Sequence, residues 1–216
     1  YESMAGQINV ALKNPNTAER FHLNAYAGSG GRTELNLVVG PKGEHDDHGE
    51  EEDHHQHIKG SLLAHGAMSQ LRTDMNGDGF LDNPLFSNLS LRNEWHFDGH
   101  GGLGAQVAFN YQNINTISGK LEYNPTDEVR SRLWGVNTQT RRYEASAKVG
   151  YVFPNKPWKS FGSQWSALYH DQRGDYGYQS YKGEQRSGRI NLLFASRILN
   201  ESNTFTTGFS YVFDDY

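Results

Sequence analysis

The segment Asp74–Asp82 carries oxygen-bearing groups at alternate positions, which is the pattern of an EF-hand-type calcium loop. The candidate ligands are Asp74, Asn76, Asp78, Phe80 through its main-chain carbonyl, and Asp82. Gly79 stands where such loops need a sharp turn, but Leu85 replaces the bidentate glutamate that normally closes the site. The segment is therefore either a Ca²⁺ loop or an Asx- and glycine-rich turn without an ion.

A second group of possible metal ligands lies in a low-complexity acidic segment, residues 41–57, which we expect to be a loop. Its histidines are His45, His48, His54, His55 and His57. Imidazole and carboxylate groups suit Zn²⁺, Cu²⁺ or Ni²⁺. Their irregular spacing argues against a fixed tetrahedral site. The segment is either a solvated loop with incidental metal affinity or a metal-gathering loop that points to a metal-containing cargo.

Aromatic and cationic residues in the polar stretches could contact a ligand, although loop aromatics often serve only in packing. The candidate ligand-binding residues are Trp134, Arg142, Tyr176, Tyr178 and Tyr181. Patterns typical of catalysis are missing from the sequence: a nucleophile elbow, a phosphate loop, a His-Glu-x-x-His helix or a carboxylate pair. The adjacent His170 and Asp171 do not by themselves indicate a triad. We therefore do not expect an enzyme.

The composition is poor for a soluble domain of this size. Only 35% of the 216 residues are hydrophobic and the mean hydropathy is -0.78, whereas Gly (24), Tyr (12) and Phe (11) are abundant. A sheet with one apolar and one wet face needs no more than this. Cysteine is absent, which excludes disulfides and thiolate metal sites, and the net charge of -5 argues against a nucleic-acid partner. Apolar runs long enough for a transmembrane helix are also absent.

Alternation of apolar and polar residues is the strongest pattern in the chain. In Tyr143–Phe153 the odd positions are Tyr, Ala, Ala, Val, Tyr and Phe, and Leu103–Gln112 alternates in the same way. Successive side chains of a strand point to opposite faces, so one face meets an apolar medium and the other a polar one. A run of about 11 residues is also long enough for a tilted strand to cross a bilayer. The pattern predicts an all-β antiparallel sheet that forms part of a transmembrane barrel wall.

About nine barrel strands follow from the same pattern. Their expected ranges are 21–27, 33–39, 58–71, 89–97, 103–112, 143–153, 161–169, 190–194 and 205–213. Residues 99–102, 154–159 and 200–203 read as short turns, and 113–141 and 171–187 as long polar loops. Short turns on one side and long loops on the other favour an outer-membrane barrel over a soluble sandwich. The segment 41–57 falls on the short-turn side and is the one misfit.

The two faces of such a wall have different expected environments. Gln106, Asn110, Glu144 and Lys148 would line a wet lumen. A girdle of aromatic residues would mark the membrane interface on the short-turn side, comprising Trp95, Phe97, Tyr151, Phe153, Trp158 and Phe161.

Several short motifs, in order along the chain, resemble TonB-dependent outer-membrane receptors of the Bacteroidota type. Residues 1–10, with Gly6-Gln7-Ile8-Asn9-Val10, resemble the last strand of their plug domain. The stretch 28–34 resembles their first barrel hairpin. The further matching segments are 74–85, 151–157 and 214–216. The resemblance implies that residues 1–15 end a plug and that residues 16–216 begin the barrel.

That family implies active uptake across the outer membrane of a Gram-negative bacterium, driven by a TonB-type energy-transducing complex. The expected cargo is a small metal complex or metal: a ferric siderophore, haem, cobalamin or free metal. Cobalamin receptors of the family hold Ca²⁺ in an early outside loop, and residues 74–82 lie in a similar place. Because the family barrel has about 22 strands, we expect further strands from the parent protein or another chain. The alternatives are a passive porin or adhesin barrel and a soluble Ca²⁺-binding β-sandwich.

Overall fold

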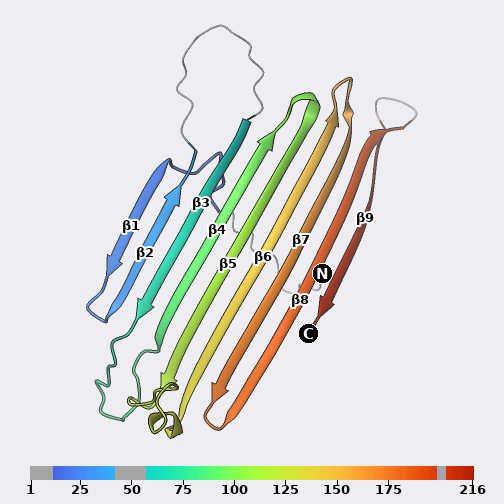
Figure 1. The fold of residues 1–216 in the computed structure, drawn as a ribbon. Coiled ribbons are helices and arrows are strands. Elements are labelled where there is room, and N and C mark those ends of the chain that lie inside the picture. Colours follow the sequence, from blue (N-terminus) through green and yellow to red (C-terminus); the bar gives the residue numbers. More distant parts are fainter. Residues whose placement is uncertain (1–11, 42–56, 199–202) are drawn as a thin grey trace.

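The computed structural model describes residues 12–41, 57–198 and 203–216, and in these ranges it is one open antiparallel sheet (Figure 1). The strands, in order both along the chain and across the sheet, are β1 (Phe21–Ala27), β2 (Arg32–Val39), β3 (His57–Ser69), β4 (Leu85–Asp98), β5 (Leu103–Gly119), β6 (Gly135–Phe153), β7 (Lys156–Tyr176), β8 (Gln179–Arg197) and β9 (Thr204–Asp215). Two 3-10 turns, η1 (His100–Gly102) and η2 (Arg130–Arg132), complete the described elements. The all-β prediction and the count of nine strands are confirmed.

Every strand pairs with its sequence neighbour, so all connections lie at two ends of the sheet (Figure 1). We call one end the turn end; it carries the tight connections 99–102 and 154–155, and the connection 40–56 also joins it. The opposite end is the loop end, with the connections 28–31, 70–84, 120–134 and 177–178. The helical elements in the described ranges are too short and too polar for any of them to span a membrane.

The predicted loops at 113–141 and 171–187 are largely wrong. Strand β5 continues to Gly119 and β6 begins at Gly135, so only residues 120–134 lie outside the ladder. Strands β7 and β8 are joined by Gly177 and Tyr178 alone, and the φ of 62° at Gly177 suits a tight hairpin turn. These strand ends carry polar residues on both faces, so the alternation that marks the rest of the strand is missing from their sequence. Pairing with the neighbouring strand, not an apolar stripe, keeps them extended.

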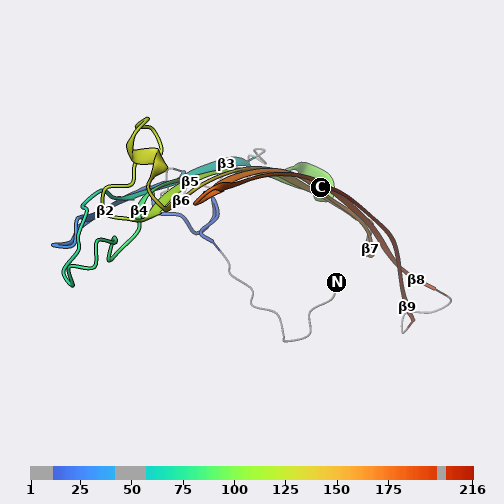
Figure 2. The same cartoon turned by 90° about the horizontal axis from the view of Figure 1, so that it is seen from below.

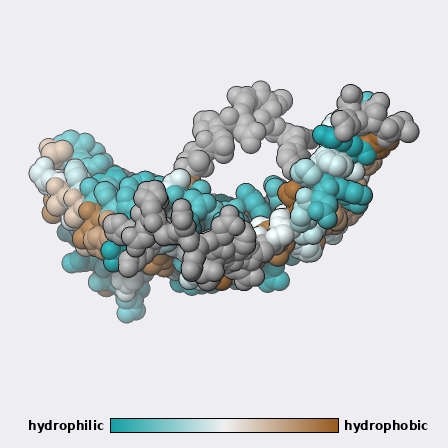
Figure 3. All heavy atoms as spheres, turned by 90° about the horizontal axis from the view of Figure 1, so that it is seen from above, coloured by the Kyte–Doolittle hydropathy of each residue, from teal (hydrophilic) through white to brown (hydrophobic). Residues whose placement is uncertain are grey.

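The sheet is a single curved layer with unlike faces. Figure 2 shows the segment before β1 on the concave side of the arc. In the space-filling view much of the hydrophobic surface lies toward the outer side of the arc, and hydrophilic residues line the inner side (Figure 3). The register explains this separation, because Val107 pairs with Ala147 and Ala147 with Trp165 on one face, whereas Gln106 pairs with Lys148 on the other. The predicted lumen set Gln106, Asn110, Glu144 and Lys148 therefore shares the concave face.

Aromatic rows bound the apolar part of the convex face. At the loop-end boundary Tyr111, Tyr143 and Tyr169 stand side by side on β5, β6 and β7, with ring centroids 5.1 Å and 6.2 Å apart. Toward the turn end Tyr151 pairs with Phe161, and the Lys159 Nζ lies 4.7 Å from the Phe153 ring centroid. On β4, Trp95 and Phe97 also lie on the convex face toward the turn end. Between the two rows the strands span roughly 27 Å along their length. The apolar band of outer-membrane barrels has a similar height, about 25 Å.

Gly102 closes the turn end between β4, β5 and β6, and it gives the first prediction. Its φ is +85°, and a Cβ there would lie 2.0 Å from the Val152 carbonyl oxygen. We expect Gly102→Ala to lower the free energy of unfolding of the full-length protein by about 2 kcal/mol more than Gly101→Ala. Gly101 is the matched control, since its φ is also positive (+74°) but its Cβ would meet nothing within 4 Å. Equal urea midpoints for the two variants would show that the contact with β6 is unimportant.

Candidate functional site

The concave face holds a buried ionic cluster centred on Glu94 of β4, whose exposure is only 1%. The Arg92 guanidinium donates to Glu94 Oε2 from Nε (2.9 Å) and Nη2 (2.5 Å). On the other side, His96 Nε2 lies 2.8 Å from Glu94 Oε1, and Gln106 Nε2 of β5 also donates to this oxygen. Arg92 Nη1 further donates to Asn110 Oδ1 at 2.8 Å. Both carboxylate oxygens are thus bonded, which offsets the cost of burying this charge.

The segment before β1 lies on this cluster. Asn16 Nδ2 is 3.3 Å from His96 Nδ1, and the neighbouring Pro15 is fully buried. Asn14 folds the segment into a turn, because its carbonyl accepts from the main-chain N–H groups of Thr17 and Ala18. Leu12 lines a 430 Å³ cavity together with concave-face residues such as Arg92, Asn110 and Arg142. The concave face is therefore a docking surface for the chain's own N-terminal segment.

Candidate ligand-binding residues gather at the loop end, with one exception. Trp134 meets Phe80 edge to face, with centroids 6.0 Å apart, and its indole lies 3.1 Å from where a Cβ of Gly177 would be. Tyr176 and Tyr181 share the concave face of β7 and β8, and Tyr178 in the turn between them is 92% exposed. Arg142 lies on the same face of β6 but deeper toward the middle of the sheet, 3.2 Å from Glu144. The expectation that Arg142, Tyr176 and Tyr181 are loop residues is wrong, because they lie in β6, β7 and β8.

The two concave-face tyrosines lie over glycines. A Cβ on Gly174 would be 2.6 Å from Tyr176 Cε2, and one on Gly183 would be 2.4 Å from the Tyr181 hydroxyl. Both rings can therefore lie along the sheet and leave a face toward the concave side. On the convex side, Tyr123 is buried against Gly135. A Cβ on Gly135 would lie 2.2 Å from the Tyr123 ring. Burial, and secondarily the Asp175 carboxylate, raise the pKa of the Tyr123 hydroxyl.

The predicted calcium loop is an ordered set of Asx turns at the loop end. Asp74 accepts main-chain N–H bonds from Gly77 (2.7 Å), Asp78 (3.1 Å) and Gly79 (2.9 Å). Phe80 and Lys120 form an isolated β-bridge, which ties the loop to the connection after β5. Within the described ranges, groups of three or more His, Asp or Glu side chains do not converge on a common point. Ca²⁺ at Asp74, Asn76, Asp78, Phe80 and Asp82 stays a prediction.

The histidine-rich segment falls outside the described residues, which exclude His45, His48, His54 and His55. Of His57 the structure gives only its place at the start of β3, paired with Asp98. The transition-metal prediction for this segment is thus not tested. The same holds for the predicted plug strand, since residues 1–11 are not described.

The Glu94 cluster was not anticipated from the sequence. The alternation in β4 places Arg92, Glu94 and His96 on one face, which is visible in the sequence. That Gln106 and Asn110 lie opposite them depends on the β4–β5 register, which pairs His96 with Gln106 and Arg92 with Asn110. Contact with Asn16, 80 positions away, is invisible to any local pattern.

Comparisons with family models, curated proteins and solved structures give no match for this chain. Its interpretation therefore depends on the geometry of the two faces and on the residues of the sequence.

Removing the buried carboxylate tests whether the Glu94 cluster holds the concave face together. We expect Glu94→Ala to lower the free energy of unfolding by about 3–5 kcal/mol, because Arg92 loses its partner in a nearly closed site. The matched control is Glu144→Ala, which breaks the exposed pair with Arg142 and should cost less than about 1 kcal/mol. Urea unfolding of the full-length protein measures both, and trypsin cleavage after Lys13 reports release of the N-terminal segment. Similar losses in the two variants would contradict a special role for Glu94.

Proposed function

We propose that this chain forms part of the wall of an outer-membrane β-barrel that imports a small metal complex with energy from a TonB-type system. The observation that carries the barrel part is the contrast between the two faces. The convex face exposes Phe109, Trp165 and Phe213 to its surroundings, and the concave face presents charged and amide groups. A soluble protein rarely leaves such a continuous apolar surface open, whereas a lipid-facing wall requires it.

The open edges support the same proposal. In the described ranges β1 pairs only with β2, and β9 only with β8. Unpaired backbone groups inside a bilayer are too costly to persist, so further strands of the parent protein would complete the ring. The loop end would face outward, since it carries the long connections 70–84 and 120–134. The turn end would face the periplasm, with the connection 40–56 as the exception among its otherwise short turns.

Active uptake, as opposed to passive flow, is favoured by the docked N-terminal segment. Leu12, Pro15 and Asn16 lie against the concave face, on the side where a lumen would be. A plug whose last strand lies in residues 1–15 would fill this lumen and need energy to move. Cargo would first meet the aromatic residues Trp134, Tyr176 and Tyr181 at the loop end. Calcium in the Asp74–Asp82 loop would order the neighbouring connection.

The alternative, a soluble β-sandwich, would place the apolar face inside the protein and not against lipid. In a sandwich the apolar face would be covered by a second sheet, but the nine described strands form one layer. A passive porin or adhesin remains the closer alternative, because it shares the barrel wall and differs only in the plug and its energy coupling.

A pair of neighbouring arginine substitutions in β6 tests the barrel. Ala147 faces the convex side between Val107 and Trp165, and Ser146 faces the concave side between Ala108 and Ser166. We expect Ala147→Arg to destabilise the assembled protein by about 2–4 kcal/mol and Ser146→Arg to be tolerated. Outer-membrane fractionation and heat-dependent electrophoretic mobility of the full-length protein measure assembly. If Ser146→Arg is the damaging variant, the concave face is the buried one and the barrel is wrong.

Transport assays test the energy coupling. Cells that produce the full-length protein should accumulate at least one labelled ferric siderophore, haem or cobalamin, and a protonophore should abolish the uptake. Cells lacking the protein give the background for each compound. Uptake that persists in the presence of the protonophore would instead support a passive porin, and no uptake of any metal complex would refute the cargo class.

A further inference from the structure

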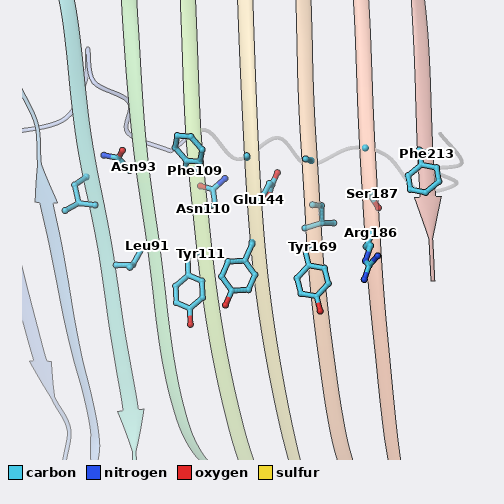
Figure 4. A pocket seen from close by; sticks show the side chains of 16 residues that line it. Leu91, Asn93, Phe109, Asn110, Tyr111, Glu144, Tyr169, Arg186, Ser187 and Phe213 are labelled. Carbon is cyan, nitrogen blue, oxygen red and sulfur yellow. The ribbon is translucent and has the colours of Figure 1, made fainter.

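A shallow apolar hollow lies in the convex face across β3 to β9 (Figure 4). Its floor is a run of the smallest side chains in neighbouring strands: Ala145 of β6 pairs with Ala167 of β7, which pairs with Gly188 of β8. Phe109 and Phe213 flank this floor, and beyond Phe109 the lining continues to Leu91 of β4 and Leu62 of β3. The hollow has a volume of about 740 Å³, and it continues toward the turn end into a second hollow of about 450 Å³ beside Trp165.

The rim of the hollow on the loop side is amphipathic. Tyr111 and Tyr169 extend toward the loop end with their hydroxyl groups outward, and Arg186 extends in the same direction (Figure 4). The Arg186 guanidinium carbon lies 6.0 Å from the Tyr169 ring centroid. Tyrosine hydroxyls and an arginine head group above an apolar surface mark the depth at which lipid head groups begin.

The Arg186 guanidinium is only weakly paired with carboxylates. Its side chain is 66% exposed, and its salt-bridge partner Glu184 is 3.9 Å away. Glu184 is held more closely by Lys182, at 2.8 Å. Asp215 stands opposite Arg186 in the β8–β9 register, but no salt bridge joins them in the described part of the chain. Farther toward the loop end on β7, Arg173 Nε lies 3.4 Å from Asp171 Oδ2, so these two residues form an ion pair. An anionic group at the rim would therefore be attracted mainly by Arg186.

We propose that this hollow is a binding site for one phosphate-bearing acyl lipid of the outer leaflet. An acyl chain lies over Ala145, Ala167 and Gly188, and the phosphate lies beside Arg186 and the tyrosine hydroxyls. The inference rests on the proposed membrane location, and it adds a specific ligand on the outside of the wall, separate from the cargo path on the concave face. Small floor residues let the chain approach the sheet closely, and the flanking rings restrict it to one place.

Filling the floor tests the acyl-chain part. A Cβ on Gly188 would meet nothing within 4 Å, so Gly188→Leu occupies the hollow without straining the sheet. The probe is dimyristoyl phosphatidylglycerol added to the delipidated full-length protein in detergent, with bound lipid counted by native mass spectrometry. We expect about tenfold weaker binding in Gly188→Leu, the equivalent of losing contact with about two methylenes.

Gly66→Leu is the matched control. Gly66 lies on the convex face of β3, outside this hollow, and its Cβ would also meet nothing within 4 Å. This variant should bind the lipid as the unchanged protein does. Equal affinities in all three proteins would overturn the site, and so would equal losses in both variants, because a general surface effect would then explain them.

Replacing the rim cation tests the phosphate part, and it remains informative if Gly188→Leu fails to assemble. The unchanged protein should prefer phosphatidylglycerol to phosphatidylcholine, and Arg186→Gln should abolish this preference. Arg173→Gln, which removes a cation already paired with Asp171, should retain it. An unchanged preference in Arg186→Gln would overturn the assignment. Fractionation of the unchanged protein separates this failure from that of the proposed function: a protein absent from the outer membrane refutes the barrel itself.

Discussion

The register of the antiparallel ladder is the constraint on which the rest of this structure depends. Because side chains alternate, a slip of β6 by one residue against β5 would move Ala147 to the concave face, opposite the face of its partner Val107, and Lys148 to the convex one. Every property of the two faces follows from this pairing: the aromatic rows, the ionic cluster and the hollow. The contrast between the two faces specifies the register, because a one-residue slip would place charged side chains on the apolar face and apolar side chains on the polar face.

On the concave face, polar contacts determine how the strands and the N-terminal segment fit together, although the sheet has little apolar core. Glu94, Arg92, His96 and Gln106 join β4 to β5, and Asn16 joins the N-terminal segment to the same group. A fully bonded cluster of this kind adds modest net stability but favours one arrangement, since any other placement of the segment would lose the contact between Asn16 and His96. The apolar side chains of the convex face offer fewer directional contacts of this kind. The polar face therefore determines where the N-terminal segment docks.

Sequence reasoning recovered the elements wherever the two faces differ. Tyr143–Phe153 and Leu103–Gln112 were placed as strands because one face is apolar, and both lie inside β6 and β5. It failed where both faces are polar: residues 113–119 and 171–176 carry no apolar stripe, yet they continue the ladder. Among the candidate site residues, the loop-end position of Trp134 and Tyr178 followed from the strand order. The depth of Arg142 and the cluster around Glu94 required the register between strands, which local composition does not encode.

The extension of the strands past the tyrosine row changes how the loop end should be understood. Beyond Tyr143 and Tyr169 the convex face carries charged residues that pair along their own strands, as in Arg173 with Asp171 and Lys182 with Glu184. These charged pairs accompany β7 and β8, which remain paired up to the turn at Gly177. Tyr176 and Tyr181 are therefore held by the sheet, with rings over Gly174 and Gly183, and are not carried by a long loop. Side chains positioned by a ladder lose less conformational entropy on binding than side chains on a loop, so a ligand arriving at this end would meet a surface already in place.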